Sequence, residues 1–405
     1  MVTATIDPGR LLGNLDTLAG YTSTPGSGVT RLAWSEPWRA AVACLERWGA
    51  AAGAAVVMDA VGNVIAELPG ADMAAPALVT GSHLDTVPSG GRLDGSYGVV
   101  AAWEVFAALQ DAGMQLRHQV RAAAFVNEEG IVLPPFTGSR AVAGLIDDEE
   151  LAALAPVLEQ AGLPSMPASI QGWDRVAATV ELHIEQGPVL DAESIPIGVV
   201  TAVTGQQRGT VVITGRTNHA GTTPMAMRRD ALVPAAELVM EVEKLAGPGG
   251  CEVATVGRLV LDPGAPNVVP GRVEMSFDLR SVDDRLVLGA LAKLRLAAAD
   301  IARARGVEIA VVAQPATPAV VMDSFVRNTI EAAASAHGLS TRPIPSGAGH
   351  DCAIMSALGP VGMIFVPSME GVSHHESEAT PDDALVKGAA LLLDTLVALD
   401  AADHG

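Results

Sequence analysis

The chain has 405 residues and a formal net charge of −21 at pH 7. This length exceeds what one hydrophobic core usually covers, so we expect two domains. The negative charge argues against nucleic acid and anionic membranes as partners. No uncharged run reaches the ~18 residues of a membrane span, and no signal-peptide pattern opens the chain. The three cysteines are too scattered for a disulfide framework. We therefore expect a cytoplasmic protein.

Strand-like and helical patterns alternate over much of the chain. Apolar runs that suit buried strands lie at residues 77–80, 120–126 and 361–366. Helical patterns separate them, as at residues 99–110, and residues 381–399 close the chain as an apolar helix. This alternation predicts an α/β domain with a largely parallel sheet.

The pattern changes in the middle of the chain. Residues 207–318 read as strand, helix, two strands, helix and strand. This order is typical of a small antiparallel sheet with helices on one face, the split βαβ or ferredoxin-like arrangement. We predict that residues 1–206 and 319–405 form one discontinuous catalytic domain, and that residues 207–318 form an α+β domain inserted into it.

Five side chains that can bind metals lie at predicted strand ends of the first domain. They are His83, Asp94, Glu129, His183 and His374. The carboxyl ends of strands are where open α/β sheets place their ligands. Imidazole and carboxylate suit zinc and also admit manganese, cobalt or nickel. Five ligands exceed the need of one tetrahedral ion, so we predict two divalent ions ~3.5–4 Å apart with Asp94 as the bridge.

Two further carboxylates have expected roles beside the metals. Glu128 precedes Glu129 on extended backbone, where neighbouring side chains point opposite ways. We expect Glu128 to take a proton from a water that bridges the cations and to return it to the leaving nitrogen. Asp85 follows His83 by two residues, and its carboxylate is expected to fix the tautomer of that imidazole. In isolation, each motif could also be a solvated polar turn.

Seven segments of the chain carry a resemblance to a known family. They are residues 83–95, 127–130, 183–187, 218–225, 266–270, 346–351 and 371–374. In this order they resemble the hydantoinase/carbamoylase family of dinuclear-metal amidohydrolases. That family includes N-carbamoyl-L-amino acid hydrolases, allantoate amidohydrolases and β-ureidopropionases, within the aminoacylase/carboxypeptidase metallopeptidase superfamily.

The resemblance implies how the candidate ligands divide between the metals. One ion would be bound by His83, Asp94 and His183, and the other by Asp94, Glu129 and His374. Glu128 matches the catalytic base. His375 stands beside His374, so the adjacent histidine remains an alternative ligand.

The resemblance also implies substrate contacts and an assembly. Arg280 and Asn267 match positions that hold the substrate carboxylate, a task that suits an arginine fork. Gln207 matches a substrate contact, although Gln206 is adjacent, and Gly349 would offer backbone to the substrate. The resemblance also implies that the inserted domain, residues 207–318, is a lid and dimerisation domain through which a homodimer forms.

In that homodimer, His219 would reach the partner's active site and stabilise the oxyanion of the tetrahedral intermediate. His219 as a loop cap and Arg280 in a strand-surface ion pair remain alternatives.

We therefore expect a metal-dependent hydrolase of linear C–N amide bonds in ureido acids. The favoured reaction converts an N-carbamoyl-L-amino acid and water to the L-amino acid, ammonia and carbon dioxide. Allantoate amidohydrolase and β-ureidopropionase activities are alternatives, as are an aminoacylase or metallo-exopeptidase and a non-catalytic ureide-binding protein. Residues 131–135 are more apolar than the Arg-Phe that relatives commonly carry there, which leaves the substrate side chain open.

Overall fold

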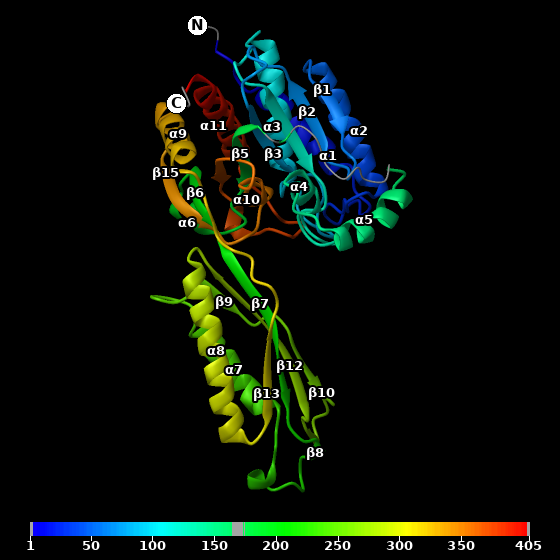
Figure 1. The fold of residues 1–405 in the computed structure, drawn as a ribbon, viewed down its shortest axis with the longest axis vertical. Coiled ribbons are helices and arrows are strands. Elements are labelled where there is room, and N and C mark those ends of the chain that lie inside the picture. Colours follow the sequence, from blue (N-terminus) through cyan, green and yellow to red (C-terminus); the bar gives the residue numbers. More distant parts are fainter. Residues whose placement is uncertain (1–2, 164–172, 174, 403–405) are drawn as a thin grey trace. The chain divides into compact units, whose positions relative to one another are not determined.

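The computed structural model describes residues 3–163, 173 and 175–402 (Figure 1). The chain divides into two compact units: Met1–Thr201 with Met322–Gly405, and Ala202–Val321. The predicted insertion at residues 207–318 lies inside the second unit. Over the described residues, no helix combines the length and apolar character needed to cross a membrane.

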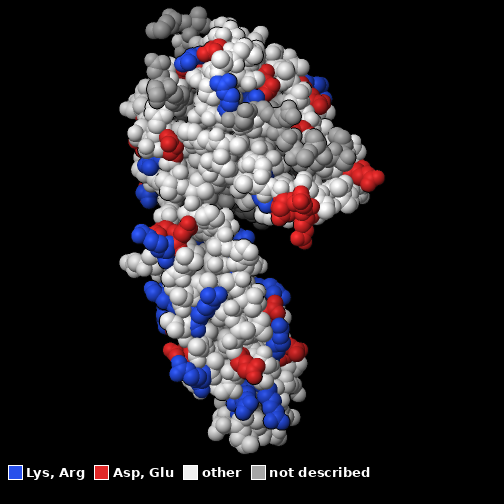
Figure 2. Space-filling view, viewed as in Figure 1, with Lys and Arg blue, Asp and Glu red and all other residues white. Residues whose placement is uncertain are grey.

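The two units differ in charge. The second holds 13 of the 25 Lys and Arg residues but only 12 of the 46 Asp and Glu residues. Figure 2 shows Lys and Arg spread over the visible face of this unit. The net negative charge of the chain therefore belongs to the first unit, where it favours cations over anions near the surface.

A nine-stranded sheet forms the centre of the first unit, although its edge strand at Val320–Val321 falls among the residues of the second. In spatial order its strands are β1 (Ala55–Met58), β2 (Val64–Leu68), β4 (Val120–Phe125), β3 (Ala77–His83), β5 (Val176–Ile184), β16 (Val361–Val366), β6 (Ile197–Val203) and β14 (Val320–Val321), with β15 (Thr341–Ser346) also paired to β6. The four neighbours β4, β3, β5 and β16 are parallel, and the outer pairings described are antiparallel. The predicted α/β class with a largely parallel sheet is confirmed.

Helices cover this sheet. They are α1 (Pro8–Ala19), α2 (Glu36–Ala51), α3 (Ser96–Asp111), α4 (Thr137–Val142), α5 (Asp148–Gln160), α6 (Val189–Glu193), α9 (Ser324–Ala336), α10 (Asp351–Met355) and α11 (Asp382–Ala401). Every residue of β3 and β16 is buried. Strands buried on both faces need continuous apolar runs rather than alternation, which explains the uninterrupted runs in the sequence.

The second unit has its own sheet and core. Its five-stranded antiparallel sheet has the order β10 (Leu259–Asp262), β12 (Arg272–Ser281), β7 (Gly205–Thr214) and β13 (Glu308–Ala313), with β9 (Val253–Thr255) paired to β12. Alternate residues of β12, such as Val273, Met275 and Phe277, pack in one core with apolar residues of α7 (Leu232–Glu243) and α8 (Asp284–Arg305). Numbered along the chain as β7, β10, β12 and β13, the strands lie in the order 2-3-1-4. The predicted ferredoxin-like split βαβ arrangement is confirmed.

Candidate active site

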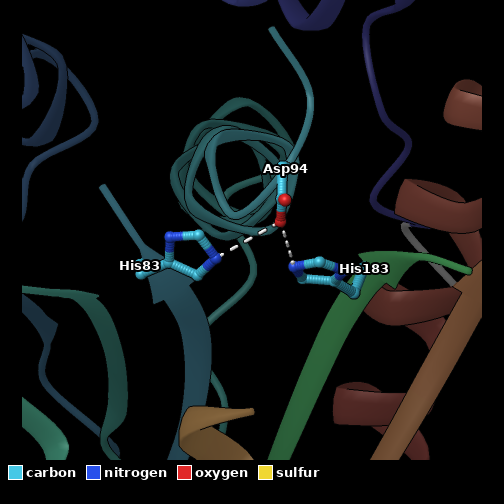
Figure 3. A group of neighbouring side chains, drawn as sticks. All are labelled: His83, Asp94 and His183. Atoms are coloured by element: carbon cyan, nitrogen blue, oxygen red, sulfur yellow. Dashed lines mark ion pairs between the residues drawn. The ribbon is translucent and has the colours of Figure 1, made fainter. Parts of the chain in front are cut away.

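Two histidines and an aspartate meet at the carboxyl ends of neighbouring parallel strands. His83 ends β3, His183 lies next to the end of β5, and the loop before α3 supplies Asp94. Figure 3 shows both imidazoles facing the Asp94 carboxylate, with Nε2–Oδ1 distances of 3.4 Å for His83 and 3.2 Å for His183. A Cβ at Gly95 would lie 2.4 Å from the His83 ring, so glycine lets the loop pass this close to the histidine.

The hydrogen bonds of the two rings show which ring nitrogen is left to bind a cation. Nδ1 of His83 contacts the Asp85 carbonyl at 2.9 Å, and Nδ1 of His183 contacts the Ile184 carbonyl at 2.8 Å. A carbonyl only accepts, so each Nδ1 carries the proton. Nε2 is therefore the nitrogen of each ring that faces Asp94 Oδ1, which is buried and has no hydrogen-bond partner among the described residues. Nε2 of His183 also accepts the Gly95 N–H at 3.2 Å. A bound cation satisfies such facing acceptors.

The pKa shifts of His83 and Asp94 also indicate a site that favours positive charge. Burial acts to lower the pKa of His83, but the charges of Glu128 and Asp94 outweigh it and raise that pKa well above its usual value. Burial acts to raise the pKa of Asp94, yet the neighbouring histidines hold it well below its usual range. A divalent cation bound at these groups would interact favourably with the same carboxylates.

A second group shares Asp94. Its other oxygen, Oδ2, lies 3.1 Å from His374 Nε2, and that nitrogen lies 3.4 Å from Glu129 Oε1. Glu129 Oε1 is also buried without a hydrogen-bond partner in the described part of the chain. Burial and the Asp94 charge raise the pKa of Glu129 to about 7. Asp94 therefore presents one oxygen to each of two groups, and all five predicted ligands belong to them.

Only one of the two adjacent histidines, His374 and His375, lies beside the other candidate ligands. His374 has a left-handed backbone, with φ of 56°, and its ring contacts Asp94. The ring of His375 instead bonds the Ser377 hydroxyl at 2.8 Å and accepts the Ser377 backbone N–H. His374 is thus the one beside the other candidate ligands.

Glu128 lies beside the first group. Its Oε2 is 3.9 Å from His83 Nε2 and its residue is buried. Burial raises the pKa of Glu128 well above its usual range, and the charges of Asp351 and Glu129 add to this despite the opposing effect of His83. A carboxylate with this affinity for protons suits a general base.

The prediction that the Asp85 carboxylate orients the His83 ring is wrong, because another group of Asp85 makes that contact. The carbonyl of Asp85, not its carboxylate, contacts His83 Nδ1. The carboxylate instead accepts the backbone N–H groups of Glu128 at 3.2 Å and Glu129 at 3.3 Å. Asp85 therefore orients three residues of the site: its backbone carbonyl fixes the His83 ring, and its side chain fixes the backbone of Glu128 and Glu129.

A buried arginine, absent from the predicted site, anchors the same loop. The guanidinium of Arg31 donates to the carbonyls of Leu84 and Leu18 and to the Ser96 hydroxyl. Burial lowers the pKa of Arg31 to about 10, although the charge of Asp85 opposes this. Arg31 thereby ties the end of β3 to the start of α3, which are the two ends of the segment that carries Asp94.

The second unit brings two predicted substrate contacts together. Strands β8 (Asn218–His219) and β11 (Val268–Val269) pair, and the Asn267 carbonyl accepts the Ala220 N–H at 2.9 Å. His219 is exposed, and its Nδ1 accepts the N–H groups of Gly221 and Thr222. The ring proton is therefore on Nε2, so His219 caps its loop and still presents a donor.

Arg280 and Gln207 have partners inside the second unit. Arg280 makes two hydrogen bonds to the Asp278 carboxylate, at 3.0 and 2.7 Å. Burial acts to raise the pKa of Asp278, but Arg280 and Arg208 outweigh it and lower that pKa. Gln207 is buried, and its Nε2 donates to two backbone carbonyls, whereas Gln206 on the same strand is only half-buried.

Residues 79–398 match the model of peptidase family M20/M25/M40. The chain belongs to this family. The N-carbamoyl-L-amino-acid amidohydrolase of Paenarthrobacter aurescens is 39% identical over 390 residues, which cover 93% of this chain and 95% of that protein. The allantoate amidohydrolase of Escherichia coli (strain K12) is 33% identical over 386 residues, covering 93% and 94%. A crystal structure of an amidase of the hydantoinase/carbamoylase family from Burkholderia multivorans has a TM-score of 0.92 at 36% identity, covering 98% and 99%.

The predicted resemblance is therefore confirmed, and the chain is an amidohydrolase of this family. Its candidate site contains further buried residues that the sequence reasoning did not single out. The His350 ring centroid lies 4.7 Å from that of His183, and His350 Nε2 contacts the Ser346 hydroxyl at 2.8 Å. Glu181 accepts the Ser82 hydroxyl at 2.6 Å. The sequence could have indicated His350, because this residue follows Gly349 in the segment 346–351, which is one of the seven that carry the resemblance.

Gly349 itself has an aromatic neighbour in the amidohydrolase. A Cβ at this position would lie 2.6 Å from Cζ of Phe136. The Phe136 ring thus occupies the space beside the Gly349 backbone, and a side chain at position 349 would require that ring to move. The apolar segment 131–135 directly precedes Phe136, whose backbone N–H donates to the Glu128 carbonyl at 3.1 Å.

Proposed function

We propose that this amidohydrolase cleaves the linear C–N bond of a ureido acid, converting an N-carbamoyl-L-amino acid and water to the L-amino acid, ammonia and carbon dioxide. The observation that carries the proposal is the Asp94 carboxylate, which faces one ligand group with each oxygen while Glu128 lies alongside. The substrate class is supported by the 39% identity to a carbamoyl amidohydrolase over nearly the full length of both chains.

Two divalent cations fit this donor set, which consists of neutral imidazole nitrogens and carboxylate oxygens. We assign one cation to His83, Asp94 and His183, and the other to Asp94, Glu129 and His374. When bound, such ions polarise the scissile carbonyl and lower the pKa of water to ~7. Zinc, manganese, cobalt and nickel all suit these ligands.

Glu128 performs the proton transfers in the proposed reaction. Its carboxylate takes a proton from the attacking water as the new C–O bond forms. It then gives this proton to the leaving nitrogen as the first C–N bond breaks, and so returns to its ionised form. The carbamic acid that remains breaks its own C–N bond, which releases the second nitrogen and carbon dioxide. Asp85 keeps Glu128 in place through the backbone hydrogen bond described above.

The second unit supplies the proposed substrate contacts. Arg280 and Asn267 bind the substrate carboxylate, with Asp278 holding the plane of the guanidinium. His219 donates from Nε2 to the oxyanion, and Gly349 offers backbone to the substrate. Gln207 is retained as a contact with Gln206 as its alternative, since the half-buried Gln206 has the more accessible side chain. We further propose a homodimer through this unit, in which His219 serves the partner's site.

A substrate panel tests the proposal. The protein is assayed with Mn²⁺, Co²⁺ or Zn²⁺ on N-carbamoyl-L-amino acids, N-carbamoyl-β-alanine, allantoate, N-acetyl amino acids and dipeptides. The expected result is the highest kcat/KM on an N-carbamoyl-L-amino acid. Preference for dipeptides or N-acetyl amino acids would overturn the ureido assignment, and binding without turnover would indicate a ureide-binding protein.

Allantoate hydrolysis is the second candidate. It is favoured by the allantoate amidohydrolase of Escherichia coli, which matches this chain over nearly the same extent as the carbamoyl amidohydrolase. Allantoate is also a ureido acid, so the same metal groups and base serve both reactions. The ratio of kcat/KM for allantoate and for carbamoyl amino acids decides between them.

A further inference from the structure

One buried carboxylate outside the proposed ligand set joins two segments of the site. Glu378 lies four residues after His374 and is 5% exposed. Its Oε1 accepts the backbone N–H groups of Leu93 at 3.0 Å and Asp94 at 3.1 Å. Its Oε2 accepts the Ser373 hydroxyl at 2.9 Å. Glu378 therefore holds the backbone at Asp94 with one oxygen and the residue before His374 with the other.

The loop around Asp94 is shaped to receive this carboxylate. A Cβ at Gly91 would lie 2.0 Å from Glu378 Oε1, so a side chain at that position would displace Glu378. The Ser373 hydroxyl also lies 3.3 Å from Asp94 Oδ2, and Gln186 Nε2 donates to the same oxygen at 3.0 Å. The orientation of the shared carboxylate is thus set from several sides, with Glu378 fixing its backbone.

The two metal groups depend on Glu378 to different extents. His83 and His183 stand on buried strands, and a backbone carbonyl fixes each ring. His374 stands in a loop, with a left-handed backbone and a side chain that is 51% exposed. The contact between Ser373 and Glu378 ties this loop to the segment that carries Asp94. Loss of Glu378 should therefore loosen His374 more than His83 or His183.

We propose that Glu378 is a positioning residue that holds Asp94 and His374 at the spacing needed to bind the cation of the second group, a role that rests on the two-metal site of the proposed function. Residues that orient metal ligands typically change metal affinity by about 10–100-fold when they are replaced. The effect of removing Glu378 should fall mainly on one of the two cations, because the other keeps two ligands that are fixed on strands.

Calorimetric titration of the metal-free protein with Co²⁺ tests this role without relying on activity. Glu378→Ala should weaken one Co²⁺ by about 10–100-fold and the other clearly less, because that ion shares Asp94 but keeps His83 and His183. Glu378→Gln should restore most of the second affinity, because its amide oxygen can accept both N–H groups and its amide nitrogen can donate to Ser373. Glu376→Ala is the matched control, since Glu376 is exposed in the same loop and should bind both ions as the wild type does.

The outcomes separate this role from the proposed function. If Glu378→Ala weakens the binding of both ions equally, or of neither, while the wild type still binds two ions, the positioning role is overturned and the two-metal site is not. A Glu378→Gln variant as weak as Glu378→Ala would also overturn it, by showing that charge matters rather than position. Wild-type protein that binds a single Co²⁺ would overturn both. Should Glu378→Ala not fold, Ser373→Ala removes the contact to Glu378 Oε2 together with the longer contact to Asp94 Oδ2, and should weaken the same ion.

Discussion

The carboxylate of Asp85 accepts the backbone N–H of Glu128 at 3.2 Å, while the carbonyl of Asp85 contacts the His83 ring at 2.9 Å. A single residue thus controls a proposed metal ligand through its backbone and the proposed base through its side chain. A substitution that changes only the side chain should separate these two effects.

Asp85→Asn should lower kcat with little change in metal content. The amide can still accept one N–H, but it no longer holds both Glu128 and Glu129, so the base is less well placed. Replacement of such supporting groups typically costs about 10–100-fold. Steady-state kinetics and metal analysis check this, with Asp72→Asn as control because Asp72 accepts a backbone N–H in an exposed turn. Loss of one metal, with unchanged kcat for the molecules that keep both, would show instead that the side chain mainly positions the proposed ligand Glu129.

Glu128→Gln and Glu129→Gln should fail in different ways. Glu128→Gln removes the proton acceptor, and loss of general acid–base catalysis typically costs about 10²–10⁴-fold in rate, with both metals retained. Glu129→Gln places an amide where a buried carboxylate oxygen now lacks a hydrogen-bond partner in the described chain, so it should lose metal. Turnover and metal content of the two purified proteins are compared. Substantial turnover by Glu128→Gln would contradict the mechanism.

Much of this site was predictable from the sequence because its ligands follow uninterrupted apolar strands. Residues 77–80 and 361–366 are buried on both faces, so their runs stand out, and His83 and His374 follow them. The short elements α4 and α10 were not predicted, because helices of six and five residues complete too few turns for a period to emerge.

Partners at the level of atoms were less predictable. Asp85 was expected near His83, but sequence spacing does not tell a carbonyl from a carboxylate. Gln207 and Gln206 alternate across β7, and a shift of one residue exchanges a buried amide for an accessible one. Pairing across the sheet, rather than local pattern, decides that register.

Arg280→Lys should raise KM for the substrate carboxylate. A lysine cannot form the planar fork that Arg280 directs at Asp278, and a hydrogen bond to a charged group contributes about 1.5–3 kcal/mol, or roughly 10–100-fold in affinity. The variant should also discriminate less between an N-carbamoyl amino acid and its carboxamide. Arg208→Lys is the control, since Arg208 also pairs with Asp278 but is more exposed. If Arg280→Lys still discriminates between the N-carbamoyl amino acid and its carboxamide as the wild type does, Arg280 does not bind the substrate carboxylate. Its role would then be only the strand-surface ion pair with Asp278.

Mixing two inactive variants tests whether His219 acts across a dimer. In a mixed dimer of Glu128→Gln and His219→Ala subunits, the Glu128→Gln subunit supplies an intact His219 to the site that keeps Glu128. One of the two sites is then complete, so activity should return after subunit exchange. Refolded mixtures are assayed against each variant alone, and sedimentation confirms that dimers form. If His219 serves its own subunit, every site in the mixture lacks one group, and no activity returns.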